Sequence, residues 1–353
     1  MTVTTSNIKK PIIIAGPCSA ETEEQLFNTA KALTQSTKID MLRAGIWKPR
    51  TRPGNFEGIG EKGLKWLVDA GKAHNLPTTT EVANAKHVEL ALKAGVDVLW
   101  IGARTTVNPF SVQDIADAVK GSNVPVMIKN PINPDIQLWV GAIERIAAAG
   151  INDISAIHRG FSSFEKTKFR NEPKWGIPIE LMRLFPDLPI ICDPSHIGGS
   201  RELIEPLSQK ALDMNMAGLM IETHLTPDEA WSDAKQQITP NALNDLLTNL
   251  IVREKTIGNP DFLTKLDTLR TQIDDSDQRL LEILAGRFKI ISEIGHYKKE
   301  NNTTILQSDR WFEILQKRKE NGIELGINED FIDSLLKLIH KESVLLQTKI
   351  MNS

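Results

Sequence analysis

Short runs of apolar and β-branched residues recur through roughly the first 225 residues, and most are followed by a segment with helical periodicity. Such runs, bounded by turn residues, are typical of buried strands. The segments between them, such as Gly60–Asn75 and Asn84–Gly95, have the spacing of amphipathic helices. The eight predicted strands are Pro11–Ala15, Met41–Ile46, Thr78–Val82, Val98–Gly102, Val126–Lys129, Asp153–Ile157, Ile190–Cys192 and Gly218–Glu222.

This alternation predicts the α/β class. Strands that alternate with helices form a parallel sheet, and eight such units in about 250 residues are typical of a closed (β/α)₈ TIM barrel. A doubly wound open sheet is the alternative. It is disfavoured because no glycine-rich dinucleotide fingerprint follows the first strand.

The pattern changes near Ile257–Pro260, and beyond this point almost every signal is helical. A long helix is predicted first, and two further helices follow at about Asp309–Asn321 and Asn328–Ile350. We therefore divide the chain into a barrel domain, 1–255, and a small all-α three-helix domain, 256–353. The long helix has an apolar stripe over roughly 35–40 residues, formed by Phe262, Leu266, Leu269, Ile273, Leu280, Leu284, Phe288 and Ile291.

A helix of ~38 residues is about 57 Å long. A domain of about 95 residues cannot cover such a stripe by itself, so the stripe predicts packing against a second copy of the chain. We expect a homodimer formed through the helical domain, and the sequence leaves open whether dimers join into a larger homo-oligomer.

Composition narrows the class of protein. The 353 residues are 41% hydrophobic and 25% charged, with a formal net charge of −3, which gives no reason to expect nucleic acid or an anionic membrane as partner. No apolar run approaches the ~20 residues of a membrane span, and the N-terminus lacks the apolar core of a signal peptide. With two cysteines, Cys18 and Cys192, no disulfide framework is implied. We expect a cytoplasmic protein.

Polar residues follow every predicted strand, at the ends that meet at one mouth of a barrel. Six cations there suit phosphorylated, carboxylated substrates, and a mixed sulfur, nitrogen and oxygen set suits a divalent transition metal. Taken singly, Cys18 could instead be a core residue and His196 a helix cap. We interpret Asp193 as a carboxylate that orients a metal ligand or a water molecule, and Cys192 as a core residue. The cations are Arg43, Lys48, Arg50, Arg104, Lys129 and Arg159, and the ligand set is Cys18, His196, Glu222 and Asp233.

The motifs AGPCS, KPRT, IGAR, DPSH followed by GG, and GLMIE resemble 3-deoxy-D-arabino-heptulosonate 7-phosphate synthase in its shorter, microbial type I form, across roughly residues 10–250. The resemblance implies a divalent metal (Mn²⁺, Fe²⁺, Co²⁺ or Zn²⁺) on Cys18, His196, Glu222 and Asp233. It implies that Arg43, Lys48, Arg104, Lys129 and Arg159 bind phosphoenolpyruvate. Arg50 and Thr51 would hold the phosphate of erythrose 4-phosphate, and we add Glu81 and Asp193 as substrate-binding candidates.

A related family, 3-deoxy-manno-octulosonate 8-phosphate synthase, shares the barrel and much of the site. Its counterpart of Lys48-Pro49-Arg50-Thr51 reads closer to KANRS, so this stretch favours the four-carbon aldehyde. The chain departs from many relatives at Lys129-Asn130-Pro131, which puts the loop shape in doubt and leaves the lysine in place. In the implied reaction the metal polarises the aldehyde, C3 of phosphoenolpyruvate attacks it, water adds at C2 and phosphate leaves. A Schiff-base mechanism on Lys129 or Lys48 is disfavoured because neither sequence context is apolar enough to lower a lysine pKa.

The helical domain has its own pattern of cations. Arg287 and Lys298 are eleven residues apart and share a helix face, whereas Arg270 lies about 25 Å before Arg287. One chain therefore cannot bring Arg270 and Lys298 to one small ligand, but two antiparallel chains could.

Across about residues 262–350 this pattern resembles the all-helical chorismate mutases, which implies Lys298 and Gln347 at the breaking ether oxygen. Gln307 stands where an aspartate is usual, and Trp311 where a glutamate usually contacts the substrate hydroxyl. The matching positions are Arg270, Arg287, Lys298, Arg310, Ser343 and Gln347.

Three hypotheses remain for the helical domain: a second enzyme, a regulatory module that binds chorismate or prephenate, or a dimerisation device without a ligand. The last is weakest because it leaves the cations unexplained. We expect both activities in one chain, with feedback from the helical domain onto the barrel.

Overall fold

A computed structural model of the chain describes residues 10–49, 54, 56–253, 260–306 and 308–353, with the backbone alone for 260 and 308–310. The chain divides into two compact units, Met1–Lys255 and Thr256–Ser353, and each is described by itself.

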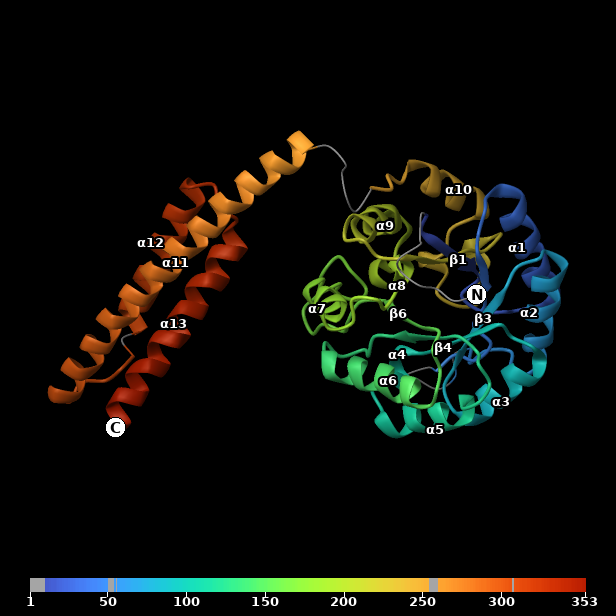
Figure 1. Cartoon of the computed structure of the whole chain (residues 1–353), viewed down its shortest axis with the longest axis horizontal. Helices are drawn as coiled ribbons and strands as arrows, with labels where there is room; N and C mark the ends of the chain where they lie inside the picture. Colours follow the sequence, from blue (N-terminus) through green and yellow to red (C-terminus); the bar gives the residue numbers. More distant parts are fainter. Residues whose placement is uncertain (1–9, 50–53, 55, 254–259, 307) are drawn as a thin grey trace. The chain divides into compact units, whose positions relative to one another are not determined.

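Eight parallel strands close into a barrel in chain order, each strand pairing with the next and β8 with β1 (Figure 1). The predicted closed (β/α)₈ barrel is confirmed, and the open sheet is excluded. The strands are β1 Ile12–Gly16, β2 Met41–Arg43, β3 Thr78–Val82, β4 Val98–Ile101, β5 Val126–Lys129, β6 Ile154–His158, β7 Ile190–Cys192 and β8 Gly218–Glu222.

The second strand is shorter than predicted, because it ends at Arg43 and not at Ile46. Gly45 leaves the barrel ladder and exchanges backbone hydrogen bonds with the loop after β1, at Cys18 and Ala20. A side chain at Gly45 would not fit there, since a Cβ would lie 2.6 Å from the Cys18 carbonyl oxygen. This detour brings the loops after β1 and β2 together at the mouth.

Helices surround the strands (Figure 1). Six of them have a side-chain N-cap: Thr22, Asn84, Asn108, Asp135, Asp193 and Thr239 each accept a hydrogen bond from a first-turn N–H. The helices are α1 Glu23–Ser36, α2 Lys62–Ala73, α3 Ala85–Ala94, α4 Ala103–Thr106, α5 Pro109–Val119, α6 Ile136–Ala148, α7 Gly176–Leu184, α8 Pro194–Gly198, α9 Ile204–Asp213 and α10 Pro240–Asn249, with 3₁₀ turns η2 Arg201–Leu203, η3 Pro227–Glu229 and η4 Ala234–Gln236.

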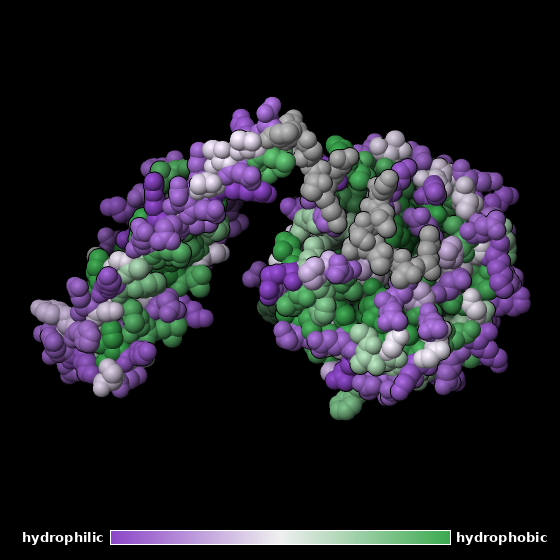
Figure 2. Space-filling model, viewed as in Figure 1, coloured by the Kyte–Doolittle hydropathy of each residue, from purple (hydrophilic) through white to green (hydrophobic). Residues whose placement is uncertain are grey.

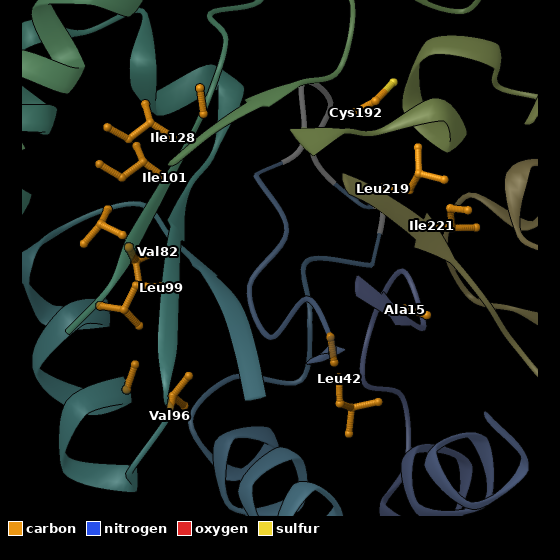
Figure 3. Close-up of a cluster of buried hydrophobic side chains, with 14 of the residues drawn as sticks. Ala15, Leu42, Val82, Val96, Leu99, Ile101, Ile128, Cys192, Leu219 and Ile221 are labelled. Atoms are coloured by element: carbon orange, nitrogen blue, oxygen red, sulfur yellow. The ribbon is translucent and has the colours of Figure 1, made fainter. Parts of the chain in front are cut away.

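Two layers of apolar side chains fill this unit. Alternate residues of each strand face outward to the helices, as Leu99, Ile101 and Ile128 do in Figure 3. The other set fills the barrel interior, with Trp100 and Met220 among the buried residues. The same alternation puts Arg43, Lys129 and Glu222, the last residues of three strands, on the inward side. Cys192 lies in the outer layer, as predicted for a core residue.

The second unit consists of α11 Pro260–Glu300, α12 Ser308–Glu324 and α13 Glu329–Asn352, all somewhat longer than predicted. Helix α13 packs against both others (Figure 1). Gly295 permits the close approach of α11 and α13, since a Cβ there would lie 3.1 Å from the Ile350 side chain. Within the described residues, no helix has both the length and the apolar character that a membrane crossing requires.

The first half of α11 lacks a covering layer. From 261 to 283 its side chains are exposed except for a half-buried Leu266. These include large apolar residues of the predicted stripe, such as Leu269, Ile273 and Leu280, which are 47%, 59% and 51% exposed. Figure 2 shows such apolar residues in green on the surface of this unit. The stripe therefore extends well beyond what α13 covers.

Candidate active site

Three predicted metal ligands meet at the carboxyl end of neighbouring strands. The ligand atoms of Cys18, Glu222 and Asp233 all lie within 4.8 Å of one another, and the Cys18 Sγ is 3.3 Å from the Asp233 Oδ2. Cys18 follows β1 and Glu222 ends β8, whose last residues pair in the ladder. Gly16 makes this turn possible, because its φ is +147° and a Cβ would lie 2.0 Å from the Arg43 carbonyl oxygen.

His196 lies just outside this cluster, with its Nε2 3.7 Å from the Glu222 Oε1. Asp193 caps α8 by accepting a hydrogen bond from the His196 backbone N–H, and the same carboxylate lies 2.8 Å from the His196 Nδ1. If Nδ1 carries the ring proton, Nε2 is left unprotonated toward Glu222. This is how an outer carboxylate fixes the tautomer of a metal-binding histidine.

The electrostatics favour a cation among these ligands. Burial and the neighbouring Glu222 raise the pKa of the Cys18 thiol to about 12. Burial would also raise the pKa of Glu222 and Asp233, but adjacent cations hold both below their usual range. Among the described residues, the buried Glu222 Oε1 accepts no hydrogen bond of good geometry. A thiol, an imidazole nitrogen and two carboxylates fit a divalent transition metal.

Cations surround the ligand set: Arg43 and Lys129 are buried, and Lys48 is half-buried. The Lys48 Nζ lies 2.8 Å from the Cys18 Sγ, and the Arg43 guanidinium lies 3.0 Å from Glu222. Lys129 forms an ion pair of 2.9 Å with Asp193. Burial would raise the pKa of Asp193, but His196 and Lys129 hold it well below its usual range. Arg43 and Lys129 thus each have a buried anionic partner, whereas Lys48 donates to a thiol.

A second group of cations lies around Arg159, which is buried and donates to the Asn171 Oδ1 at 2.7 Å. Burial and the charges of Arg170 and Arg104 lower the pKa of Arg159 to about 10. Arg104 is exposed at the start of α4. The predicted Glu81 accepts from the Trp100 indole N–H at 2.9 Å, and this ring also lies 5.1 Å from Arg43 and 5.5 Å from Lys129. The predicted Arg50 and Thr51 lie outside the described residues.

Besides Asn171, the sequence did not predict Arg170, Gln236 and Gln237 as residues of this site. Arg170 lies 3.1 Å from the Asp233 Oδ1 and also contacts Gln236, whose Nε2 donates to Glu222 at 2.6 Å. Gln237 accepts from the Cys18 backbone N–H at 3.0 Å. Asp233 itself has a left-handed backbone with φ of 50°, a strained conformation that its neighbours stabilise. The Gln-Gln doublet after Asp233 was the one available signal.

The helical unit contains a smaller polar cluster. The Arg287 Nη1 donates to the Ser343 Oγ at 2.7 Å, and Gln347 lies one turn further along α13. The Gln347 Oε1 is buried without a hydrogen-bond partner among the described residues. The Lys298 Nζ donates to the Ile305 carbonyl at 2.5 Å. Gln307 and the side chain of Arg310 lie outside the described residues.

Arg270 is not part of this cluster. It lies in the uncovered half of α11, 28 positions before Lys298, which corresponds to about 42 Å along the helix. Its guanidinium pairs locally with Asp267 at 3.3 Å. A single chain therefore brings Arg287 to Ser343 and Gln347 to Gly295, which is one turn before Lys298 on α11. Arg270 is left apart.

Curated relatives match the barrel. The chain is 35% identical to the phospho-2-dehydro-3-deoxyheptonate aldolase of Thermotoga maritima over 67% of this chain and 68% of that protein. It is 29% identical to a 2-dehydro-3-deoxyphosphooctonate aldolase of Brucella anthropi, over 72% and 94%. A solved structure of the Thermotoga maritima aldolase (DAHP synthase) superposes with a TM-score of 0.62 at 31% identity, over 70% of this chain and 71% of that one.

Two family models match successive parts of the chain. Residues 269–348 match the model of chorismate mutase type II, and residues 2–257 match that of the DAHP synthetase I family. The resemblances inferred from the motifs are thereby confirmed for both parts. The chain belongs to the DAHP synthetase I family and also contains a chorismate mutase type II domain, so that it is an enzyme with two shikimate-pathway domains.

Proposed function

We propose that the barrel domain, 1–255, condenses phosphoenolpyruvate with erythrose 4-phosphate, using a divalent metal, and that the helical domain, 256–353, converts chorismate to prephenate. The first half of the proposal rests on one observation: Cys18, Glu222 and Asp233 lie together, with Arg43 in contact with Glu222 and Lys48 in contact with Cys18. Mixed thiolate and carboxylate ligands beside Lys and Arg suit a metal-assisted reaction between anionic substrates.

In this proposal Cys18, His196, Glu222 and Asp233 hold the metal, which would polarise the aldehyde carbonyl as a Lewis acid. The cations of the chain bind and orient the substrates. Arg159, Arg104 and Arg43 offer guanidinium groups to phosphate and carboxylate, and Lys129 adds a point charge. Their positions are preorganised by Asp193, Glu222 and Asn171, so little reorganisation is needed as charge develops during attack by C3 of phosphoenolpyruvate.

For the helical domain we propose electrostatic catalysis without a nucleophile or proton transfer. Arg287 binds a substrate carboxylate beside Ser343, while Lys298 and Gln347 stabilise the breaking ether oxygen. The Lys298 ammonium has two donors left after its bond to Ile305, and the buried amide of Gln347 lies against Gly295 on α11.

We infer that a second copy of the chain covers α11. The exposed apolar residues between 261 and 283 support this arrangement, because soluble proteins rarely leave so long an apolar face in water. An antiparallel partner would also supply Arg270 to the cluster around Lys298.

We also propose a cytoplasmic location. Both cysteines are buried and unpaired, which suits a reducing compartment. The thiol of Cys18 could not act as a ligand if it were oxidised.

Two alternatives have specific support. The curated octulosonate aldolases at about 29–30% identity favour a five-carbon aldehyde instead of erythrose 4-phosphate. Trp311 favours a helical domain that mainly binds chorismate or prephenate for regulation, because the carboxylate usual at this position is missing.

Removal of the metal should inactivate only one of the two proposed activities, and this tests the bifunctional proposal. The full chain is assayed for phosphoenolpyruvate consumption and, separately, for chorismate loss, before and after metal removal. We expect chelation to abolish the first activity and leave the second within twofold. A chain that never consumes chorismate but binds prephenate would support the regulatory alternative.

Replacing Arg170 with leucine should weaken metal binding about 10–100-fold, the usual effect of losing a group that orients metal ligands. One guanidinium supports Asp233 directly and Glu222 through Gln236. Competition against a chelator measures this affinity. Arg183→Leu on α7, which breaks the exposed pair with Glu180, is the matched control and should change nothing. Equal affinities of wild type and Arg170→Leu would refute this role.

Metal affinity should also rise with pH. The metal-free Cys18 thiol is protonated at neutral pH, because its pKa is raised to about 12, and a metal binds the thiolate. Binding therefore releases one proton, and the apparent affinity should rise about tenfold per unit between pH 6 and 8. His196 adds little above pH 7, since burial lowers its pKa. A flat profile, or an unchanged slope in Cys18→Ala, would exclude Cys18 as a ligand.

We also expect a ligand of the helical domain to inhibit the barrel. Saturating prephenate should slow phosphoenolpyruvate consumption by the full chain. An effector that binds a less active state of the protein more tightly increases the population of that state. Arg287→Ala should abolish this inhibition while the uninhibited synthase rate stays unchanged. Unchanged synthase rates in the wild-type chain under saturating prephenate would rule the feedback out.

A further inference from the structure

A stacked aromatic pair lies beside the polar cluster of the helical unit. The rings of Trp311, on α12, and His340, on α13, have centroids 3.6 Å apart and planes inclined by 14°. Both residues are half-buried. Because stacking occupies the ring faces, the two imidazole nitrogens of His340 remain available at the ring edge.

His340 lies on the same face of α13 as Ser343 and Gln347, two residues that contact α11. It lies three positions before Ser343 and seven before Gln347, so all three share one face of α13 over about 10 Å. Arg287, which donates to Ser343, is also the charge that acts on His340. Among the side chains that the structure describes, none forms a hydrogen bond with the His340 ring.

The chemistry of this position is altered by Trp311. A glutamate usual there accepts a hydrogen bond from the substrate hydroxyl, whereas an indole N–H can donate but cannot accept. A neutral imidazole has one donor and one acceptor nitrogen and can replace the lost acceptor. Burial and the charge of Arg287 lower the pKa of His340, which favours the neutral ring at pH 7.

We propose that His340, oriented by its stack on Trp311, is the residue that binds the ring hydroxyl of chorismate or prephenate in the helical site. This inference rests on the proposed function of the helical domain, namely that it binds chorismate or prephenate. It adds the residue, His340, that recognises the ring hydroxyl of this ligand. The stack restricts rotation of the imidazole, and Ser343, the partner of Arg287, lies one turn further along α13.

The test compares two ligands on two variants of the full chain. His340→Phe keeps a stacked ring and removes both nitrogens, and His296→Phe makes the same change on an exposed part of α11. The ligands are chorismate and an analogue with hydrogen in place of the ring hydroxyl. His340→Phe should raise the KM for chorismate about tenfold, the loss of one buried hydrogen bond, and leave binding of the analogue within twofold. His296→Phe should change neither.

Two results would overturn the assignment. One is an unchanged KM in His340→Phe, which would leave the pair as a brace between α12 and α13. The other is an equal penalty for chorismate and the analogue, which would place the lost contact elsewhere on the ligand. Prephenate binding by calorimetry separates the inference from the proposed catalysis. If the wild-type chain binds prephenate without turning chorismate over, the tenfold loss in His340→Phe should still appear in the Kd.

Discussion

Cys18→Ala should lower the rate of phosphoenolpyruvate consumption about 10³-fold and leave chorismate turnover within twofold. The loss is large because the thiol supplies one of three ligand atoms within 4.8 Å, and a Lewis-acid metal contributes several kcal/mol to the transition state. Steady-state assays of both reactions at saturating metal provide the measurement.

Cys192→Ala is the matched control for that variant. Cys192 is equally buried, but it lies in the apolar layer between strands and helices, and its thiol forms no hydrogen bond among the described contacts. Its loss should cost about 1 kcal/mol of unfolding free energy and leave the rate of folded protein within twofold. A Cys18→Ala variant within tenfold of wild type, at full metal occupancy, would show that the thiol is not a ligand.

Arg270→Ala and Lys298→Ala should each lower chorismate turnover about 10²–10³-fold, and mixing the two variants should restore part of it. The two side chains are about 42 Å apart along one helix, so they can meet only across two chains. After subunit exchange at equal concentrations, half of the dimers are mixed, and each has one intact site of two. The mixture should therefore recover about a quarter of the wild-type rate.

The control for this complementation uses Arg287→Ala with Lys298→Ala. Both residues lie on the same half of α11, so a mixed dimer would have no intact site and recovery should be absent. If chorismate turnover also recovered in this control, the recovery could not be attributed to a site shared between two chains. Absence of recovery in the Arg270 mixture, with subunit exchange verified by mass, would refute the shared site.

The architecture was predictable because its signals are periodic. Eight apolar runs between amphipathic segments predict a parallel barrel, and the inward alternation that buries Trp100 also positions Arg43 and Lys129. The end of β2 was less predictable, since Ala44-Gly45-Ile46 is apolar enough to continue a strand. Its departure from the ladder depends on a backbone contact with Cys18, which lies far away in the sequence.

Side-chain partners were harder to predict than the residues themselves. Arg170 lies in a loop, FSSFEKTKFR, with several charges that look equivalent in sequence, and only the folded loop brings it to Asp233. Trp311 was recognised as a departure, but its partner His340 lies on another helix, and the packing of α12 on α13 determines their contact. Local pattern cannot specify such long-range pairs.

The most direct measurement of the central proposal is phosphoenolpyruvate consumption by metal-reconstituted chain, offered erythrose 4-phosphate or arabinose 5-phosphate, with and without chelator. We expect rapid consumption with erythrose 4-phosphate alone and complete loss on chelation. Preference for arabinose 5-phosphate, or a rate that is indifferent to chelator, would contradict the proposed reaction of the barrel.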